Sequence, residues 1–421
     1  MMYQKTTLDN GLCLITSYMP HTHSVCLAFF IGAGACYEIE AEAGISHFIE
    51  HILFKGTKKR KTTREISEAI EGVGGIINGG TNKELTSFWC KVADQHFFLA
   101  LDVLTDLLRN SRFEAEDIGH ERQVIIEEIN MSLDSPQHRV DLLIDELLWP
   151  GQPLGRDIAG TKQTVTDLTR QQMLNFFSQH YLPNNIIVSI AGNIQEELAI
   201  ESLNRTVGDW KSDEISAVLP SSNNQEAPRL HIEFRDTEQA HLCLGIPGIS
   251  FFHPDRFALD LLSVVLGEGM SSRLFTSVRE QQGLAYDIHS YVDHFTDSGA
   301  LVIYAGVAPK HVDNALKSIL EQLSLLCEDV SESELTKAKE LAKGRLLLRL
   351  EDNQNVAGWL GSQEILTKRI LTIDNIMSLV DTVTTEDLKR IARQLLISKK
   401  LNLAVVGPVK KEESLAKLLT L

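Results

Sequence analysis

The chain has 421 residues, of which 43% are hydrophobic and 23% charged, a composition typical of a globular protein and too apolar for disorder. Its formal net charge of −17 comes with no basic patch of the kind that nucleic-acid binders carry, so we expect no nucleic-acid partner. No apolar run reaches the ~18 residues needed to cross a bilayer, so we also expect no membrane span.

The N-terminal residues and the cysteines favour a cytoplasmic protein. The first residues lack a charged and then apolar leader, so we expect folded sequence to begin almost at Met1. Six cysteines are spread along the chain without a CxxC pair, and they lie in apolar stretches. This pattern is typical of reduced core cysteines in the cytoplasm.

Strand and helix signals alternate through the first half of the chain. The Asn10-Gly11 pair favours the positive φ angles of a tight turn and predicts a hairpin over residues 6–16. Hydrophobic periodicity then predicts strands at about 24–31, 84–93 and 185–191, and helices at about 44–54, 63–72, 95–109, 114–133, 138–148 and 166–180.

Residues 212–228 lose this periodicity and are rich in Ser, Asn and Pro, which is typical of a linker. A strand is expected at 229–234. A helix-then-strand pattern that ends at Gly192 recurs and ends at Gly407, 215 positions later. Chance likeness is the alternative to duplication. We predict two similar domains, residues 1–215 and 229–421, joined by a linker at 216–228.

The motif His47-Phe48-Ile49-Glu50-His51 lies in the helix expected at 44–54. Positions i, i+3 and i+4 share one helix face, so His47, Glu50 and His51 project together. Two neutral imidazoles one turn apart suit Zn²⁺, and the carboxylate between them can polarise a metal-bound water, as in the inverted HxxEH motif. The alternative is a polar helix face with merely hydrogen-bonded histidines. Most other residues of this helix are apolar, which argues against that alternative, because titratable groups in apolar surroundings cost free energy unless they are paired or bind a metal.

A third ligand is expected from the helix at 114–133. At about 100° per residue, Glu121 and Glu128 lie two turns apart on the border of its apolar stripe, whereas Glu127 points to nearly the opposite side. We therefore predict Glu128 as the third ligand, Glu121 as a residue that orients a ligand, and Glu127 as solvated surface charge.

These residues carry a resemblance to a known family. The run from Gly44 to His51, followed by Phe54-Lys55-Gly56-Thr57, resembles the pitrilysin/insulinase family of inverted-motif zinc peptidases. The likeness is to its short branch, which includes mitochondrial processing peptidase and bacterial relatives. That family places a glutamate some 76 residues after the second histidine, and here 76 residues separate His51 and Glu128. Because the resemblance spans both halves, it implies an α+β fold of two related domains, each a mainly antiparallel sheet packed against helices.

The segment 74–81, GGIINGGT, resembles the family's edge strand near the metal, where a substrate backbone can pair. Asn78 and Gly79 are the candidate substrate-binding residues. The family usually has alanine where this chain has Gly79, a departure that makes the edge more flexible. A simple loop is the alternative.

In the second half, Arg279 and Tyr286 match the family's Arg/Tyr pair seven residues apart. In relatives these groups hold substrate or stabilise the oxyanion opposite the zinc. We expect a helix that begins near Ser271 and ends at a left-handed Gly283, with Tyr286 opening a strand. An Arg279–Tyr286 pair within a core is the structural alternative.

The resemblance implies a zinc-dependent endopeptidase that hydrolyses peptides or extended unfolded segments, with one Zn²⁺ per chain and Glu50 as general base. A non-catalytic scaffold subunit of the same fold, or a subunit active only in a heteromer, are the alternatives. Four-domain family members enclose substrate between two halves, so we expect this shorter chain to form a homodimer. Whether Arg279 and Tyr286 would act on their own zinc or on the partner's stays open.

Overall fold

The computed structural model describes residues 3–215, 218, 220–410 and 412–421. Its internal contacts separate two compact units, each built from three segments of the chain. The first unit comprises Met1–Asn130, Asp157–Leu219 and Leu347–Ile373; the second comprises Met131–Arg156, Pro220–Leu346 and Asp374–Leu421.

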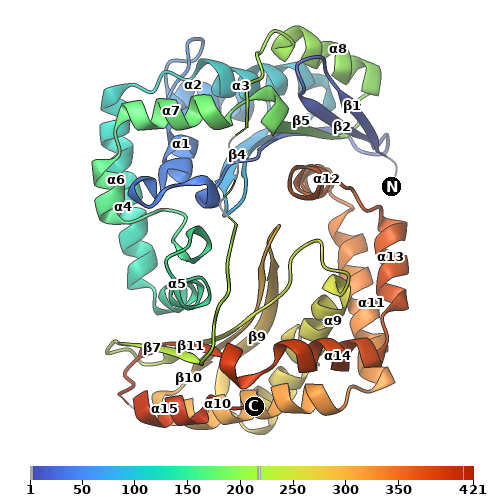
Figure 1. Cartoon of the computed structure of the whole chain (residues 1–421). Coiled ribbons are helices and arrows are strands. Elements are labelled where there is room, and N and C mark those ends of the chain that lie inside the picture. The colour runs from blue at the N-terminus through green and yellow to red at the C-terminus, as the bar shows by residue number, and fades with distance from the viewer. Residues whose placement is uncertain (1–2, 216–217, 219, 411) are drawn as a thin grey trace. The chain divides into compact units, whose positions relative to one another are not determined.

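The first unit contains a six-stranded sheet in the order β1-β2-β6-β3-β5-β4 (Figure 1). Neighbouring strands are antiparallel except β2 and β6, which run parallel. The strands are β1 (Gln4–Thr7), β2 (Cys13–Tyr18), β3 (Ser24–Ile31), β4 (Ile76–Thr81), β5 (Thr86–Ala93) and β6 (Ile186–Gly192). Strand β4 lies at one edge of the sheet and pairs with β5 alone.

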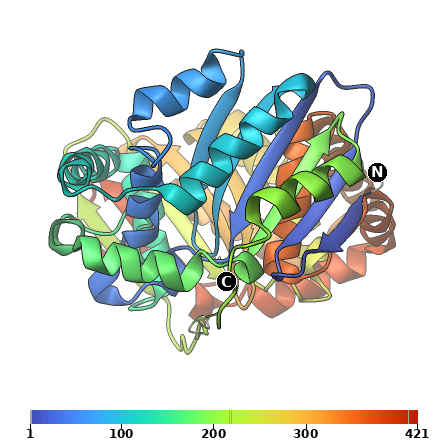
Figure 2. The ribbon, with the colours of Figure 1, turned by 90° about the horizontal axis from the view of Figure 1, so that it is seen from above.

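Helices cover both faces of this sheet. Helix α12 (Asn353–Thr367) comes from late in the sequence and packs on β3 and β6, where an added Cβ on Gly361 would overlap the Phe30 ring. Helices α3 and α8 cross the other face, as the view from above shows (Figure 2). Besides α12, the helices of this unit are α1 (Ile45–Leu53), α2 (Thr63–Glu71), α3 (Phe97–Asn110), α4 (Ala115–Asp134), α6 (Lys162–Asp167), α7 (Arg170–His180) and α8 (Glu196–Val207). Helix α4 belongs to this unit as far as Asn130.

The second unit contains a five-stranded sheet in the order β7-β11-β8-β10-β9. Its strands are β7 (Arg229–Phe234), β8 (Ala240–Pro247), β9 (Ala285–His294), β10 (Gly299–Val307) and β11 (Asn402–Gly407). Read in chain order, these strands repeat the arrangement of β2 to β6, including the parallel pair, here β7 and β11. This shared topology confirms the predicted fold of two related, mainly antiparallel α+β domains.

One face of the second sheet receives α5 (Pro136–Leu148), a helix from the first half of the sequence, which packs on β8 and β11. The other face forms the main core of the unit with α9, α10 and α14. The helices of this unit besides α5 are α9 (Arg256–Gly267), a π-helical segment (Phe275–Gln281), α10 (Val312–Glu328), α11 (Glu332–Arg349), α13 (Ile373–Thr382), α14 (Thr385–Leu395) and α15 (Glu412–Leu418). Each compact unit thus takes one helix from the other half of the sequence.

Most predicted elements are present, and two differ in an informative way. The helix expected over 166–180 is broken at Leu168, because Thr169 and Gln172 form a capping box that starts α7 anew. The helix expected after Ser271 is π-helical over Phe275–Gln281, and Gly283, whose φ is +61°, lies just after its end. The boundaries proposed for the linker at 216–228 stay a prediction, and residues 216, 217 and 219 lie outside the described residues.

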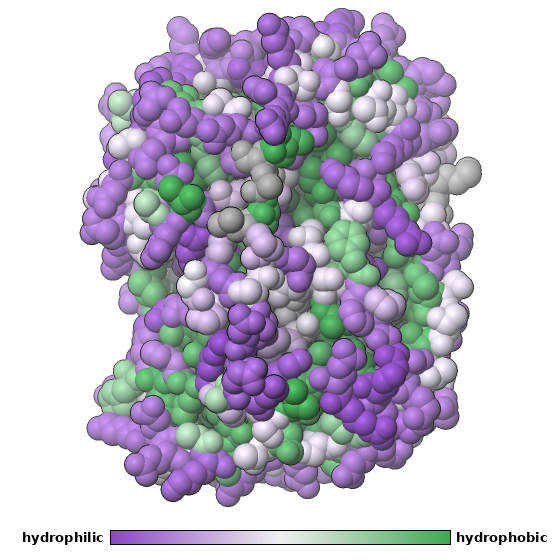
Figure 3. Space-filling view, in the orientation of Figure 1, coloured by the Kyte–Doolittle hydropathy of each residue, from purple (hydrophilic) through white to green (hydrophobic). Residues whose placement is uncertain are grey.

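The surface and the cysteines agree with the composition. Hydrophilic side chains dominate the face in Figure 3. Among the described residues, no helix has both the length and the apolar character that a bilayer crossing requires. All six cysteines are free, and five of them are buried.

Candidate metal centre

The start of helix α1 is fixed by contacts upstream of the histidine motif. The buried carboxylate of Glu38 accepts hydrogen bonds from the backbone N–H groups of Gly44 (2.8 Å) and Ser46 (2.9 Å). A negative charge at a helix N-terminus is favourable, since the unpaired N–H groups and the helix dipole both attract it. Gly44 adopts φ +96°, and a Cβ there would lie 2.5 Å from the carbonyl oxygen of Ala159, so this position requires glycine. These contacts set the direction in which the side chains of α1 point.

Helix α1 divides into a buried apolar face and a polar face. The buried hydrophobic residues are Ile45, Phe48, Ile49, Ile52 and Leu53. His47, Glu50 and His51 are partly buried on the polar side. The core contacts of the apolar face therefore hold these three side chains in place.

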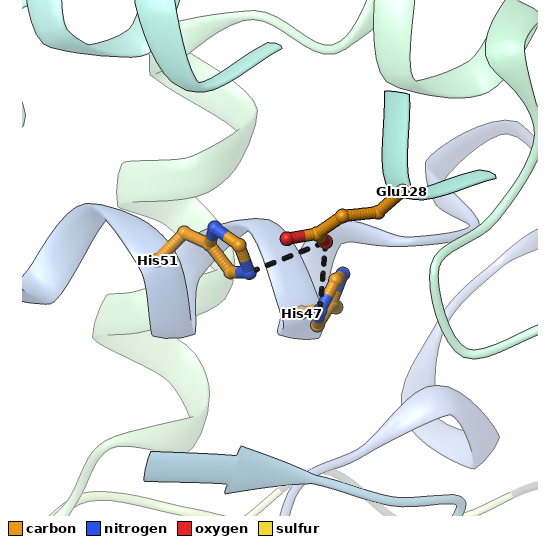
Figure 4. A group of neighbouring side chains, drawn as sticks. All are labelled: His47, His51 and Glu128. Atoms are coloured by element: carbon orange, nitrogen blue, oxygen red, sulfur yellow. Dashed lines mark ion pairs between the residues drawn. The ribbon is translucent and has the colours of Figure 1, made fainter. Parts of the chain in front are cut away.

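Helix α4 brings Glu128 to the two histidines (Figure 4). The Glu128 carboxylate oxygen Oε2 lies 3.8 Å from Nε2 of His47 and 3.6 Å from Nε2 of His51. One ligand atom from each residue falls within 4.8 Å of the other two. Ligands at about 2 Å from a tetrahedral ion stand roughly 3.3 Å from one another, so this spacing is close to that of a zinc site.

The chemistry of the donor set also fits Zn²⁺. Nδ1 of His47 is buried without a hydrogen-bond partner, and the two imidazoles present their Nε2 atoms to the same carboxylate. Burial, together with the neighbouring His51, lowers the pKa of His47 to about 4. His47 is therefore neutral near pH 7, the form that binds a metal. Imidazole nitrogens from two histidines and one carboxylate oxygen form a recognised donor set for a catalytic zinc.

Glu121 and Glu127 occupy different environments on α4. The buried carboxylate of Glu121 lies with Oε2 2.9 Å from Nδ1 of His51, and its Oε1 pairs with Nζ of Lys55 at 2.5 Å. Burial raises the pKa of Glu121, but the hydrogen bonds from His51 and Lys55 outweigh it and lower the pKa overall. Glu127 is exposed and accepts a hydrogen bond from Asn130. The structure thus places Glu121 beside Nδ1 of His51, the ring nitrogen that does not face Glu128. It places Glu127 away from the histidines.

The Glu50 carboxylate is held from the edge strand β4. Its Oε2 accepts a hydrogen bond of 2.5 Å from Oγ1 of Thr81. A Cβ on Gly79 would lie 3.1 Å from Cγ of Glu50, so the small residue lets the carboxylate approach the strand. Burial raises the pKa of Glu50 despite the hydrogen bond from Thr81. A carboxylate with a raised pKa is a better proton acceptor than an exposed one.

Strand β4 gives the predicted substrate-binding residues an open edge. Asn78 and Gly79 pair with β5 on one side only, and the Asn78 side chain accepts a hydrogen bond of 2.8 Å from the Gly79 N–H. The segment is a strand rather than a loop. Its unpaired side has the geometry that accepts an added peptide strand.

Arg279 and Tyr286 belong to the second unit. The guanidinium carbon of Arg279 lies 4.6 Å from the ring centroid of Phe275 and 5.6 Å from that of Tyr286. Tyr286 is the second residue of β9 and is 76% exposed. The structure therefore brings the predicted pair together by a cation–π contact, and the exposure of Tyr286 argues against a core pair.

Comparison with known proteins decides the family. Residues 14–162 match the insulinase family (peptidase family M16), and residues 167–341 match the peptidase M16 inactive domain. A protein of Bacillus subtilis described as an uncharacterized zinc protease is 35% identical over 412 residues, which cover 97% of this chain and 98% of that protein. The chain belongs to the insulinase family. A second uncharacterized zinc protease, from Streptomyces coelicolor, is 34% identical over 418 residues, or 98% of this chain and 91% of the relative.

Solved structures of other proteins share the fold. A protease from Helicobacter pylori has a TM-score of 0.92 at 23% identity, covering 97% of this chain and 100% of its own. A chain of complex III from Candida albicans has a TM-score of 0.86 at 16% identity, covering 99% and 100%. A protease and a chain of complex III thus share one fold, so the function of this member must be argued from its side chains.

Proposed function

We propose that this insulinase-family chain is a zinc endopeptidase that hydrolyses peptides or extended segments of unfolded protein. His47, His51 and Glu128 would hold one zinc ion per chain. The observation that carries the proposal is the position of the Glu50 carboxylate. Glu50 lies on the same face of α1 as the two histidines, and Thr81 of β4 holds its carboxylate by a hydrogen bond. A non-catalytic scaffold subunit would have no use for this arrangement.

The zinc ion, when bound, would supply a Lewis acid that polarises a water molecule and the scissile carbonyl. The Oε2 atom of Glu50 is occupied by Thr81, so we assign proton transfer to Oε1. Glu50 accepts the proton that the water loses as its oxygen attacks the carbonyl carbon. It then gives that proton to the amine that leaves when the C–N bond breaks.

The other residues position the substrate and its developing charge. The open edge of β4 at Asn78 and Gly79 would pair with the extended substrate backbone, which favours unfolded segments over folded proteins. Arg279 and Tyr286 would supply a cation and a hydroxyl to the oxyanion. The six free cysteines are compatible with a cytoplasmic site of action, where thiols stay reduced.

The proposal includes a homodimer, because peptide hydrolysis benefits from exclusion of water and from groups on both sides of the scissile bond. Mixing Glu50→Gln protein with Arg279→Ala protein tests whether sites are shared between chains. Regained activity means that Arg279 serves the partner's site, and no regain means that it serves its own chain or that the chains do not exchange. A protein that is monomeric and fully active at assay concentration contradicts the homodimer.

Cleavage of an unstructured peptide by the purified protein is the first test. We expect turnover that a chelator abolishes and added Zn²⁺ restores. A purified chain that binds zinc but cleaves no peptide, alone or mixed with cell-derived partner chains, would favour the scaffold alternative. Activity that returns only with a partner chain would favour the heteromer.

A further inference from the structure

The Glu121 carboxylate has two partners, and only one of them is a metal-binding residue. Its Oε2 lies 2.9 Å from Nδ1 of His51, and its Oε1 lies 2.5 Å from Nζ of Lys55. The side chain of Glu121 is 6% exposed, so water contributes little to its solvation. Each carboxylate oxygen therefore depends on one protein donor.

His51 and Lys55 are four residues apart, and Lys55 follows just after the last turn of α1. Glu121 enters from α4 and bridges them. The Glu121 side chain accepts from both His51 and Lys55 and so has little rotational freedom, because turning toward one partner would break the contact with the other.

A buried carboxylate without a compensating cation is costly. Without Lys55, Glu121 would keep only the imidazole N–H as a donor. Its carboxylate would then turn toward water, and it would hold Nδ1 of His51 less firmly. The orientation of the imidazole and the direction of its Nε2 would be less well defined.

We propose that Lys55 is a positioning residue for the metal centre: it holds the Glu121 carboxylate, which in turn orients His51 so that Nε2 faces Glu128. The Lys55 ammonium pairs with the Glu121 carboxylate, so it would act on His51 through Glu121. This inference rests on the proposed zinc site.

The Lys59–Asp102 pair offers a matched control. It also joins Nζ to a carboxylate oxygen at 2.5 Å in the first unit, but its side chains are 57% and 39% exposed and it lies outside the metal centre. Lys55→Met and Lys59→Met thus remove the same kind of group from two ion pairs of equal length. Lys55→Arg restores a cation at the position under test.

The experiment measures zinc affinity by competition with a chromophoric chelator, using the whole purified chain. Loss of a residue that supports a metal ligand typically weakens binding 10- to 100-fold, so we expect Lys55→Met to weaken it at least about 10-fold. Lys59→Met should match the wild type, and Lys55→Arg should recover most of the affinity. The melting temperatures of the zinc-free variants show whether each one folds.

Wild-type affinity in a folded Lys55→Met protein would overturn the inference, as would equal losses in Lys55→Met and Lys59→Met. If Lys55→Met does not fold, Lys55→Gln and Glu121→Gln replace it: both should weaken zinc binding, and wild-type affinity in Lys55→Gln would again overturn the inference. A wild-type chain that binds no zinc would contradict the proposed function itself, which is a different failure.

Discussion

The two sheets of this chain share the arrangement of five strands, yet among the described residues only the first unit has a cluster of side chains that could hold a metal ion. Helix α1 follows β3 and packs on the edge strand β4, and α9 follows β8 and packs on the edge strand β9. In both units a polar contact joins the helix to its edge strand. In the first it is Glu50 to Thr81, and in the second it is Ser263 to Ser290 at 3.1 Å.

The difference lies in the helix side chains and not in the backbone plan. Helix α9 places Ser263 and Asp260 on its polar positions and has no histidine, whereas α1 has two histidines and a carboxylate. Two units with one strand arrangement can therefore differ in the chemistry that their side chains allow.

The largest expected effect is at Glu50. General base catalysis contributes up to about 10⁴-fold, so Glu50→Gln should lower kcat by about 10³-fold or more while zinc stays bound. Peptide turnover and zinc content of the same preparation measure the two effects.

Asp260 is the counterpart for this test, because it lies on α9 and pairs with His294 on β9 at 3.0 Å. Asp260→Asn should leave turnover close to that of the wild type. Equal losses in the two variants would mean that the two units contribute alike, and the comparison would fail.

The next largest effect is expected at the proposed zinc ligands. Glu128→Ala or His47→Ala should remove most bound zinc, since each deletes one of three protein ligands. Glu127→Ala should retain zinc, because the exposed Glu127 side chain contacts Asn130 and not the histidines. The zinc content of each variant after dialysis against buffer measures these effects. Zinc loss from Glu127→Ala alone would show that Glu128 is not the ligand from α4.

A smaller effect is expected at Thr81. Thr81→Val keeps the shape and strand preference of the residue but removes the hydroxyl that fixes Glu50, and misplaced catalytic groups cost up to about 10²-fold. We expect kcat to fall by about 10-fold or more with KM and zinc content nearly unchanged.

Thr81→Ser should recover most of this activity, because it restores the donor. Ser263→Ala removes the equivalent helix–strand contact in the second unit and should not change kcat. Unchanged kcat in Thr81→Val would show that the hydrogen bond is structural only.

The smallest effect concerns stability at the start of α1. Glu38→Ala removes two hydrogen bonds to a charged acceptor, each worth about 1.5–3 kcal/mol at most, and it leaves two buried N–H groups unpaired. We expect a loss of about 3 kcal/mol in the free energy of unfolding, the lower end of the sum for two such bonds. Urea unfolding measures it, with the exposed Glu40→Ala as control, and equal midpoints for the two variants would contradict the capping role.

The fold class was predicted from the family resemblance and from the pattern that recurs after 215 positions, whereas local periodicity predicted how the motif residues face. The 3.6-residue repeat puts His47, Glu50 and His51 on one side of α1, and the same rule separates Glu128 from Glu127 on α4. These relations hold within single helices, so the sequence contains them. Their role in binding metal stays a prediction.

The contacts of Lys55 and Thr81 could not be predicted in the same way. Lys55 meets Glu121 across 66 positions of sequence, and Thr81 meets Glu50 across 31, so both depend on how separate elements pack. Spacing gave a hint for Lys55, which lies four residues after His51. The break at Leu168 was readable from Thr169 and Gln172, which form a capping box.

The central claim is that the first unit holds one zinc ion between α1 and α4. Anomalous diffraction at the zinc absorption edge from crystals of the purified chain tests this directly. The account predicts one peak per chain within bonding distance of His47 Nε2, His51 Nε2 and the Glu128 carboxylate, and no peak in the second unit. No peak at these residues in zinc-soaked crystals, or a peak held by other residues, would contradict it.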